Sequence, residues 1–249
     1  TPADCRRQRQ MCIRDRVMVP LKDFSYDLSA MADRITEKTK LIFINTPLNP
    51  TGTIITREAF EGFLKRVPSG VLLVIDEAYG EYVRDTSYPN FLNYLKVEHK
   101  LIILRTFSKV YGLAGLRIGY GIADEYLIGC LNKIRGPFNT NLLAQVAALA
   151  ALDDEEHLTK TLSANQQGLT YFYRELDEMG IVYIPTQANF FLVKVGKESG
   201  SVYESLLREG VIVRGMSGYG LPDYLRISVG LPGENEKCIQ SLKKVLAGG

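Results

Sequence analysis

The chain has 249 residues, of which 46% are apolar and 23% are charged, a composition typical of a globular protein with one large domain or two modest ones. The formal net charge of +2 conceals a basic start, because residues 1–16 carry five Arg against two Asp and the remainder sums to −1. Such a neutral body has no basic field for nucleic acid or an anionic membrane surface, and we expect neither partner.

Cysteine usage and hydropathy indicate the compartment. The four cysteines, Cys5, Cys12, Cys130 and Cys238, form no C-x-x-C pair and no dense framework, which argues against zinc and disulfide scaffolds. No apolar run approaches the length of a membrane span, and no stretch resembles a signal peptide. We therefore expect a cytoplasmic protein with reduced thiols.

The first 16 residues, TPADCRRQRQMCIRDR, differ from the rest of the chain. They lack hydrophobic periodicity and lead abruptly into the apolar VMVPL. We interpret residues 1–16 as a foreign-looking amino-terminal segment and leave it out of the fold prediction.

Residues 17–150 have the pattern of a larger α/β domain. VMVPL (17–21) predicts an edge strand, and Asp27 is placed to cap a following helix. Apolar runs of five to seven residues then alternate with helical or turn segments, which is typical of buried strands in a mostly parallel sheet. The predicted strands are LIFIN (41–45), VLLVID (71–76), LIILRTF (101–107) and RIGYGIA (117–123), and REAFEGFLKRV (57–67) is a predicted helix.

Residues 151–249 predict a smaller carboxyl-terminal α/β domain. An Ala-rich helix at 141–154 and a long amphipathic helix at 155–180 lead into it. Short strands and helices then alternate: the predicted strands are IVYIP, ANFFLVKV, VIVRG and LRISVG, and the predicted helices are SVYESLLREG and ENEKCIQSLKKVL.

Polar side chains follow three strands of the predicted larger sheet. In an open parallel α/β sheet, ligands bind beyond the carboxyl ends of the strands. The residues at these ends are Asn49 in N-P-T-G, Asp76 and Tyr79 after VLLVID, and Thr106, Ser108, Lys109 and Arg117 after LIILRTF. Each motif alone is more often a turn or a surface loop, and no P-loop motif is present, but the three together predict a ligand site.

These groups suit pyridoxal 5′-phosphate (PLP). A lysine amine can bind the cofactor aldehyde as a Schiff base, and a carboxylate can keep the pyridine nitrogen protonated so that the ring accepts electrons. A tyrosine hydroxyl and an asparagine amide can hydrogen-bond the 3-oxygen of the ring. Hydroxyls and a guanidinium beside the lysine suit the phosphate, and the lysine can also act as a general base.

NTPLNPTG, DEAY and TFSKVYGLAGLRIGY resemble signature segments of the fold-type I PLP-dependent aminotransferases of class I/II, and GVIVRGMSGYGLPDYLRISVG is similar to the histidinol-phosphate aminotransferases among them. The resemblance implies the PLP-dependent transferase fold, with Lys109 bound to the cofactor and Asp76 paired with the pyridine nitrogen. It implies Asn49 and Tyr79 at the 3-oxygen. It further implies Thr106, Ser108 and Arg117 at the phosphate, Arg226 at the substrate α-carboxylate, and Arg214 at the substrate phosphate.

The implied reaction transfers an amino group from glutamate to imidazole-acetol phosphate, giving histidinol phosphate and 2-oxoglutarate, in histidine biosynthesis. The family is homodimeric, so we expect a homodimer of the parent protein, and no metal is implied. The resemblance starts near Val17, and roughly the first third of the family's chain has no counterpart here. That part supplies a phosphate-cradling turn and a tyrosine from the partner subunit, so the activity of this chain is left open.

Three alternatives stay open. A threonine-phosphate decarboxylase of the same fold would release carbon dioxide, and formation of 2-oxoglutarate from glutamate would distinguish it. An aromatic aminotransferase would be indifferent to Arg214→Ala. An inactive fragment that only binds partners or PLP is the interpretation from another class of function.

Overall fold

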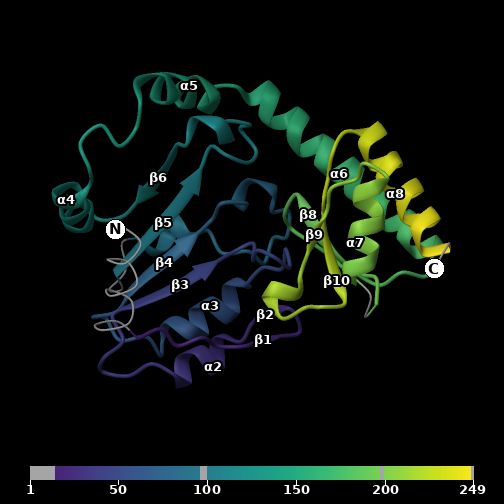
Figure 1. The fold of residues 1–249 in the computed structure, drawn as a ribbon. Helices are drawn as coiled ribbons and strands as arrows, with labels where there is room; N and C mark the ends of the chain where they lie inside the picture. The colour runs from purple at the N-terminus through teal and green to yellow at the C-terminus, as the bar shows by residue number, and fades with distance from the viewer. Residues whose placement is uncertain (1–14, 96–99, 197–198, 248–249) are drawn as a thin grey trace, which may run out of the picture.

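The computed structural model describes residues 15–95, 100–196 and 199–247, which form two four-stranded sheets and a small hairpin (Figure 1). The predicted foreign segment 1–16, with Cys5 and Cys12, therefore lies almost entirely outside the described residues. The boundaries predicted for the two domains at residue 150 remain a proposal.

The first sheet has the strand order β3-β4-β5-β6. Its first three strands are parallel, which agrees with the prediction, and β6 runs antiparallel to β5. The antiparallel pairing arises because the chain turns straight back after β5: Phe107 N donates to the Ile118 carbonyl at 3.2 Å, with no crossover helix between. The strands are Leu41–Asn45, Leu72–Asp76, Lys100–Thr106 and Gly119–Ile122.

Helices α2 (Leu28–Asp33) and α3 (Arg57–Leu64) pack beside this sheet (Figure 1). The predicted cap is confirmed, because Asp27 Oδ1 accepts a hydrogen bond from Ala30 N at 2.8 Å. The apolar side of α3 is buried against the strands. The resulting core includes Ile42, Ile44, Phe60, Phe63, Leu73, Ile75, Phe91 and Ile103.

Two expectations for the start of this region fail. Of the predicted edge strand 17–21 only Leu21 lies in a strand, because among the described residues nothing pairs with 17–20. That strand, β1 (Leu21–Lys22), pairs in a hairpin with β2 (Ser25–Tyr26). The apolar run of β3 predicts burial on both faces. Leu41 and Phe43 are instead 48% and 65% exposed, because no described element covers that face of β3.

The second sheet has the order β7-β8-β10-β9, with every pairing antiparallel. Its strands are Tyr183–Ile184, Phe190–Lys194, Tyr224–Ser228 and Arg214–Gly215. Helices α6, α7 and α8 pack with it, spanning Glu155–Glu178, Ser199–Arg208 and Pro232–Ala247. Their apolar faces form a second core that includes Phe172, Leu176, Phe191, Val193, Leu206, Leu225 and Leu242. Figure 1 shows α6 running from the first sheet to the second, as predicted for the long helix.

Helices α4 (Glu125–Ile134) and α5 (Leu142–Leu152) lie at the outside of the molecule (Figure 1). Within α5 only Ala144 and Ala148 are buried. Its large side chains are exposed, namely Leu142, Leu143, Val146, Leu149 and Leu152. A helix that is apolar on all sides is expected to be buried, so α5 presents an unpartnered apolar surface. Across the described residues, no helix combines the length and apolarity needed to cross a bilayer.

A third apolar cluster joins the two sheets. Tyr79 and Tyr82, which follow β4, pack with Val110 after β5 and with Ala188 and Phe190 at the start of β8. The loops that carry the predicted site residues are thus held directly against the second sheet.

Candidate active site

The carboxyl ends of three parallel strands lie side by side at one edge of the first sheet. Asn45 at the end of β3 is in register with Asp76 at the end of β4, and Asp76 is in register with Leu104 of β5. The loops that carry Asn49 and Lys109 therefore begin next to Asp76. The structure confirms that these strand ends converge.

Asp76 is held by its own turn and interacts with Lys109. Its Oδ1 accepts a hydrogen bond from Ala78 N at 3.0 Å. The side chain keeps solvent access, but the surrounding protein raises the pKa of the carboxyl, an effect that the Ala78 N–H and the Lys109 charge oppose. A positively charged partner at this carboxylate would lower its pKa again.

Tyr26 is a neighbour of Asp76 that the sequence did not single out. Its hydroxyl donates to Asn45 Oδ1 and accepts from Asn45 N at 3.3 Å. Burial raises the pKa of the phenol, and the charge of Asp76 raises it further. Tyr26 therefore ties the β1–β2 hairpin to the strand-end edge. A lone tyrosine in a short polar stretch gives no sequence signal for such a contact.

Lys109 presents its amine to an aromatic wall. Nζ lies 5.0 Å from the centre of the Tyr79 ring, and Tyr79 itself packs edge-on against Phe190 with ring centres 5.0 Å apart. Within the described part of the chain, Lys109 has no carboxylate within ion-pair distance. A half-buried amine without a salt bridge is available for covalent chemistry.

The predicted phosphate ligands share one turn after β5. The backbone N of Ser108 donates to Thr106 Oγ1 at 3.1 Å, so the Thr106 hydroxyl lies at the Ser108 backbone. Arg117 returns to the same turn beside Ile118, whose carbonyl accepts from Phe107 N. The Arg117 guanidinium is exposed, and its Nη1 donates to the Ala114 carbonyl at 2.9 Å. The structure thus places the three residues on one turn, where Arg117 makes its hydrogen bond to Ala114.

Arg226 reaches this edge from the second sheet. Its Nη1 donates to Asn49 Oδ1 at 2.6 Å, and its guanidinium carbon lies 4.7 Å from the centre of the Phe190 ring. Its Nε is buried with no hydrogen-bond partner among the described residues. Burial lowers the pKa of Arg226, Tyr79 raises it, and the charge of Arg214 lowers it further. An unpaired buried donor on a partly desolvated cation favours an anionic ligand.

Arg214 lies directly opposite Arg226 in the β9–β10 pairing. Opposed residues share a face of the sheet, so two cations face the same side. The Arg214 side chain is exposed, and its Nη2 donates to the Tyr219 hydroxyl at 2.9 Å. A ligand with two anionic groups would neutralise both arginines.

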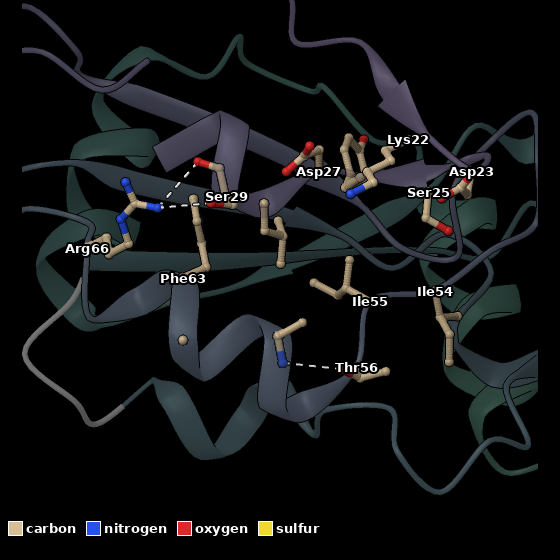
Figure 2. Close-up of a pocket in the computed structure, with 14 residues that line it drawn as sticks. Lys22, Asp23, Ser25, Asp27, Ser29, Ile54, Ile55, Thr56, Phe63 and Arg66 are labelled. Atoms are coloured by element: carbon tan, nitrogen blue, oxygen red, sulfur yellow. Dashed lines mark hydrogen bonds between the residues drawn. The ribbon is translucent and has the colours of Figure 1, made fainter. Parts of the chain in front are cut away.

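A hollow of about 610 Å³ lies elsewhere, between the β1–β2 hairpin, α2 and α3 (Figure 2). Several of its polar side chains are engaged in structural contacts. Arg66 Nη1 donates to the Ser29 carbonyl at 3.4 Å, and Thr56 Oγ1 caps α3 by accepting from Ala59 N at 3.2 Å. None of the residues predicted for the site lines this hollow, so it gives no support for catalysis there.

The strand ends thus bring together a lysine, a carboxylate and an amide, and an arginine from the second sheet reaches the amide. This set of groups suits the PLP chemistry that the sequence predicts. Residues 7–242 match the family model of aminotransferase class I and II, and the chain belongs to that family. It is 49% identical over 232 residues to a histidinol-phosphate aminotransferase of Moorella thermoacetica, a match that covers 93% of this chain and 60% of the relative. It is 50% identical to histidinol-phosphate aminotransferase 2 of Hydrogenovibrio crunogenus, covering 92% and 62%.

Solved structures agree with the family assignment and with the predicted fold. The histidinol-phosphate aminotransferase of Sinorhizobium meliloti in complex with pyridoxal-5′-phosphate aligns with a TM-score of 0.84 at 30% identity, covering 93% of this chain and 64% of that one. The enzyme from Clostridium acetobutylicum gives 0.82 at 28% identity, covering 92% and 70%. The α/β fold of the type I PLP-dependent transferases is therefore confirmed. The chain spans about 60% of the length of the curated relatives it matches.

Proposed function

We propose that this chain carries the PLP site of an aminotransferase. The observation that carries the proposal is the convergence of Lys109, Asp76 and Asn49 at one sheet edge, closed by Arg226 from the second sheet. Bound PLP supplies an electron sink for the substrate's α-carbon. The relative from Sinorhizobium meliloti, whose structure contains pyridoxal-5′-phosphate, supports the choice of cofactor.

The residues present fit this cofactor. Lys109 offers an amine for the aldehyde. The Asp76 carboxylate, whose pKa the surrounding protein raises by desolvation, would be stabilised by a protonated pyridine nitrogen. Asn49 uses its oxygen for Arg226, which leaves its amide N–H groups for the 3-oxygen, together with the Tyr79 hydroxyl. Thr106, Ser108 and Arg117 at the β5 turn would hold the phosphate.

The protein's own residues would perform the remaining tasks. Arg226 would orient the substrate α-carboxylate through the guanidinium atoms that Asn49 does not use, including the unpartnered Nε. Lys109 Nζ would act as the general base at the α-carbon, and the Tyr79 and Phe190 rings would keep water from this side of the amine. Arg214 would bind a second anionic group of the substrate.

The substrates follow from the paired arginines and from the relatives. We infer that glutamate donates the amino group and imidazole-acetol phosphate accepts it, in histidine biosynthesis. Relatives named histidinol-phosphate aminotransferase at 44–50% identity support this inference. The L-threonine-O-3-phosphate decarboxylase of Porphyromonas gingivalis shares the fold, with a TM-score of 0.72 at 26% identity. A decarboxylase of this kind remains the second candidate, because Arg214 and Arg226 would also suit the two anionic groups of a phosphorylated amino acid.

We also propose that a second copy of the protein covers α5, giving a homodimer in the cytoplasm. The five large apolar side chains that α5 exposes support a protein partner rather than solvent at this face.

The test is an absorption spectrum of the purified chain with PLP, before and after glutamate, beside Lys109→Ala. We expect a visible band of lysine-attached cofactor that glutamate removes with release of 2-oxoglutarate, and no band in the variant. A band that persists with glutamate while carbon dioxide is released from threonine phosphate would favour the decarboxylase. Arg214→Ala should weaken use of the phosphorylated substrate, and an indifferent variant would favour an aromatic aminotransferase. A folded chain without any band would refute the proposal for this chain.

A further inference from the structure

A buried ion pair lies directly behind the candidate site. Glu77, which follows Asp76 in the chain, is 3% exposed, and its Oε2 accepts from Arg105 Nη2 at 2.8 Å and from Arg105 Nε at 3.0 Å. Both nitrogens of one edge of the guanidinium thus bind a single carboxylate oxygen. Arg105 belongs to β5 and stands four residues before Lys109.

The other carboxylate oxygen is also engaged. The Tyr88 hydroxyl lies 3.1 Å from Glu77 Oε1 and 2.6 Å from the Thr46 carbonyl oxygen, so its proton is shared between them. Thr46 is the first residue after β3 and is fully buried. The side chain of Glu77 is therefore connected to β3 through Tyr88 and to β5 through Arg105.

Backbone hydrogen bonds close the same level of the sheet. Thr46 N donates to the Asp76 carbonyl at 3.0 Å, and Glu77 N donates to the Leu104 carbonyl at 2.9 Å. Successive residues of an extended chain point to opposite sides, so Glu77 holds the strand end from the side opposite Asp76. Backbone hydrogen bonds thus link the ends of β3, β4 and β5 to one another. The side chains of Glu77, Arg105 and Tyr88 link the same strand ends a second time.

A buried ion pair is weak evidence for stability, because apolar residues of similar volume often replace it without loss. The position of the ion pair, at the strand ends that carry Asp76 and Lys109, points instead to a role in placing these two residues. We propose that Glu77 is a positioning residue: with Arg105 and Tyr88 it fixes the ends of β4 and β5, and so sets the placement of the Asp76 carboxylate relative to the Lys109 amine. This inference rests on the proposed function, since the spacing matters for a ring held between those two groups.

The experiment compares Glu77→Gln with a matched control, Glu81→Gln. Glu77→Gln keeps the shape of the side chain but turns an amide toward Arg105 or Tyr88. Glu81 lies in the same segment, in the short 3-10 helix Gly80–Tyr82, and is half-buried, but its Oε2 has no hydrogen-bond partner among the described residues. Its charge interacts electrostatically with Arg105 and Glu77, so Glu81→Gln controls for the loss of a negative charge near this pair. Two quantities are measured: the PLP dissociation constant from the visible band, and the titration midpoint of the Asp76 carboxyl by NMR in the cofactor-free chain.

We expect Glu77→Gln to weaken PLP binding about tenfold or more and to shift the Asp76 midpoint, and Glu81→Gln to change neither. If the ion pair only stabilised the fold, Glu77→Gln would lower the urea midpoint of unfolding but leave the Asp76 titration as in the wild type. That result would overturn the proposal. If Glu77→Gln does not fold, Arg105→Lys is measured in the same way, because it keeps the charge but loses the two-nitrogen contact. If the wild-type chain shows no PLP band, the proposed function fails, and the Asp76 titration alone decides whether Glu77 positions this carboxylate.

Discussion

Gly52, in the N-P-T-G loop, lies so close to Thr186 that a single added methyl group should force these two loops apart. Its φ of +78° lies in the left-handed region. A Cβ placed there would lie 1.8 Å from Thr186 Oγ1, 2.6 Å from Thr186 Cβ and 3.2 Å from Thr186 Cα. Rotation of the Thr186 side chain could move Oγ1 away but not Cβ or Cα, so the backbones themselves must move apart.

The cost of Gly52→Ala follows from this geometry. The left-handed conformation costs a residue with a Cβ about 1–2 kcal/mol. Movement of the loop also breaks the hydrogen bond from Gln187 N to the Gly52 carbonyl, now 2.8 Å, and loss of a buried bond costs about 1–2 kcal/mol. We therefore expect the free energy of unfolding to fall by about 3 kcal/mol.

Urea unfolding followed by circular dichroism measures this change, since the chain has no Trp to serve as a fluorescent probe. The matched control is Gly62→Ala in α3, where an added Cβ would meet nothing within 4 Å and the helix should gain about 0.5–1 kcal/mol. A free energy for Gly52→Ala within about 0.5 kcal/mol of the wild type would refute the close contact of the Gly52 loop with Thr186. The predicted loss should also weaken PLP binding, because the same loop carries Asn49.

Two further predictions concern α8 and α5. Burial raises the pKa of Cys238 from 9.0 to about 11, so the unfolded thiol ionises first and the free energy of unfolding should fall as pH rises from about 9 toward 11, by up to about 2–3 kcal/mol. Urea titrations at several pH values should show that Cys238→Ala flattens this dependence; an unchanged slope in the variant would contradict the assignment. Leu143→Glu, at a side chain 76% exposed on α5, should shift the sedimentation of the protein toward monomer, whereas Lys160→Glu on α6 should not. Identical sedimentation of Leu143→Glu and wild type would argue against a second copy on α5.

The sequence was sufficient for features that depend on local pattern. Helix α3 follows from the spacing of Phe60, Phe63 and Leu64, and the start of α2 from the Asp27 cap. The neighbourhood of Asp76 and the loops with Asn49 and Lys109 was also predictable, because parallel strands bring their carboxyl ends to one edge whatever their order. The motifs and the alternation of strands with helices were therefore enough to predict where the candidate site lies.

Only the tertiary structure decided what surrounds those groups. The contact of Arg226 with Asn49 joins residues 177 positions apart, and it exists because the second sheet docks against the loops after β4 and β5. The pairing of Glu77 with Arg105 depends on which strands are neighbours, and the exposure of Phe43 depends on what covers β3. Periodicity reports which residues can be buried, but partners and cover are set by the packing of distant elements, which no local pattern encodes.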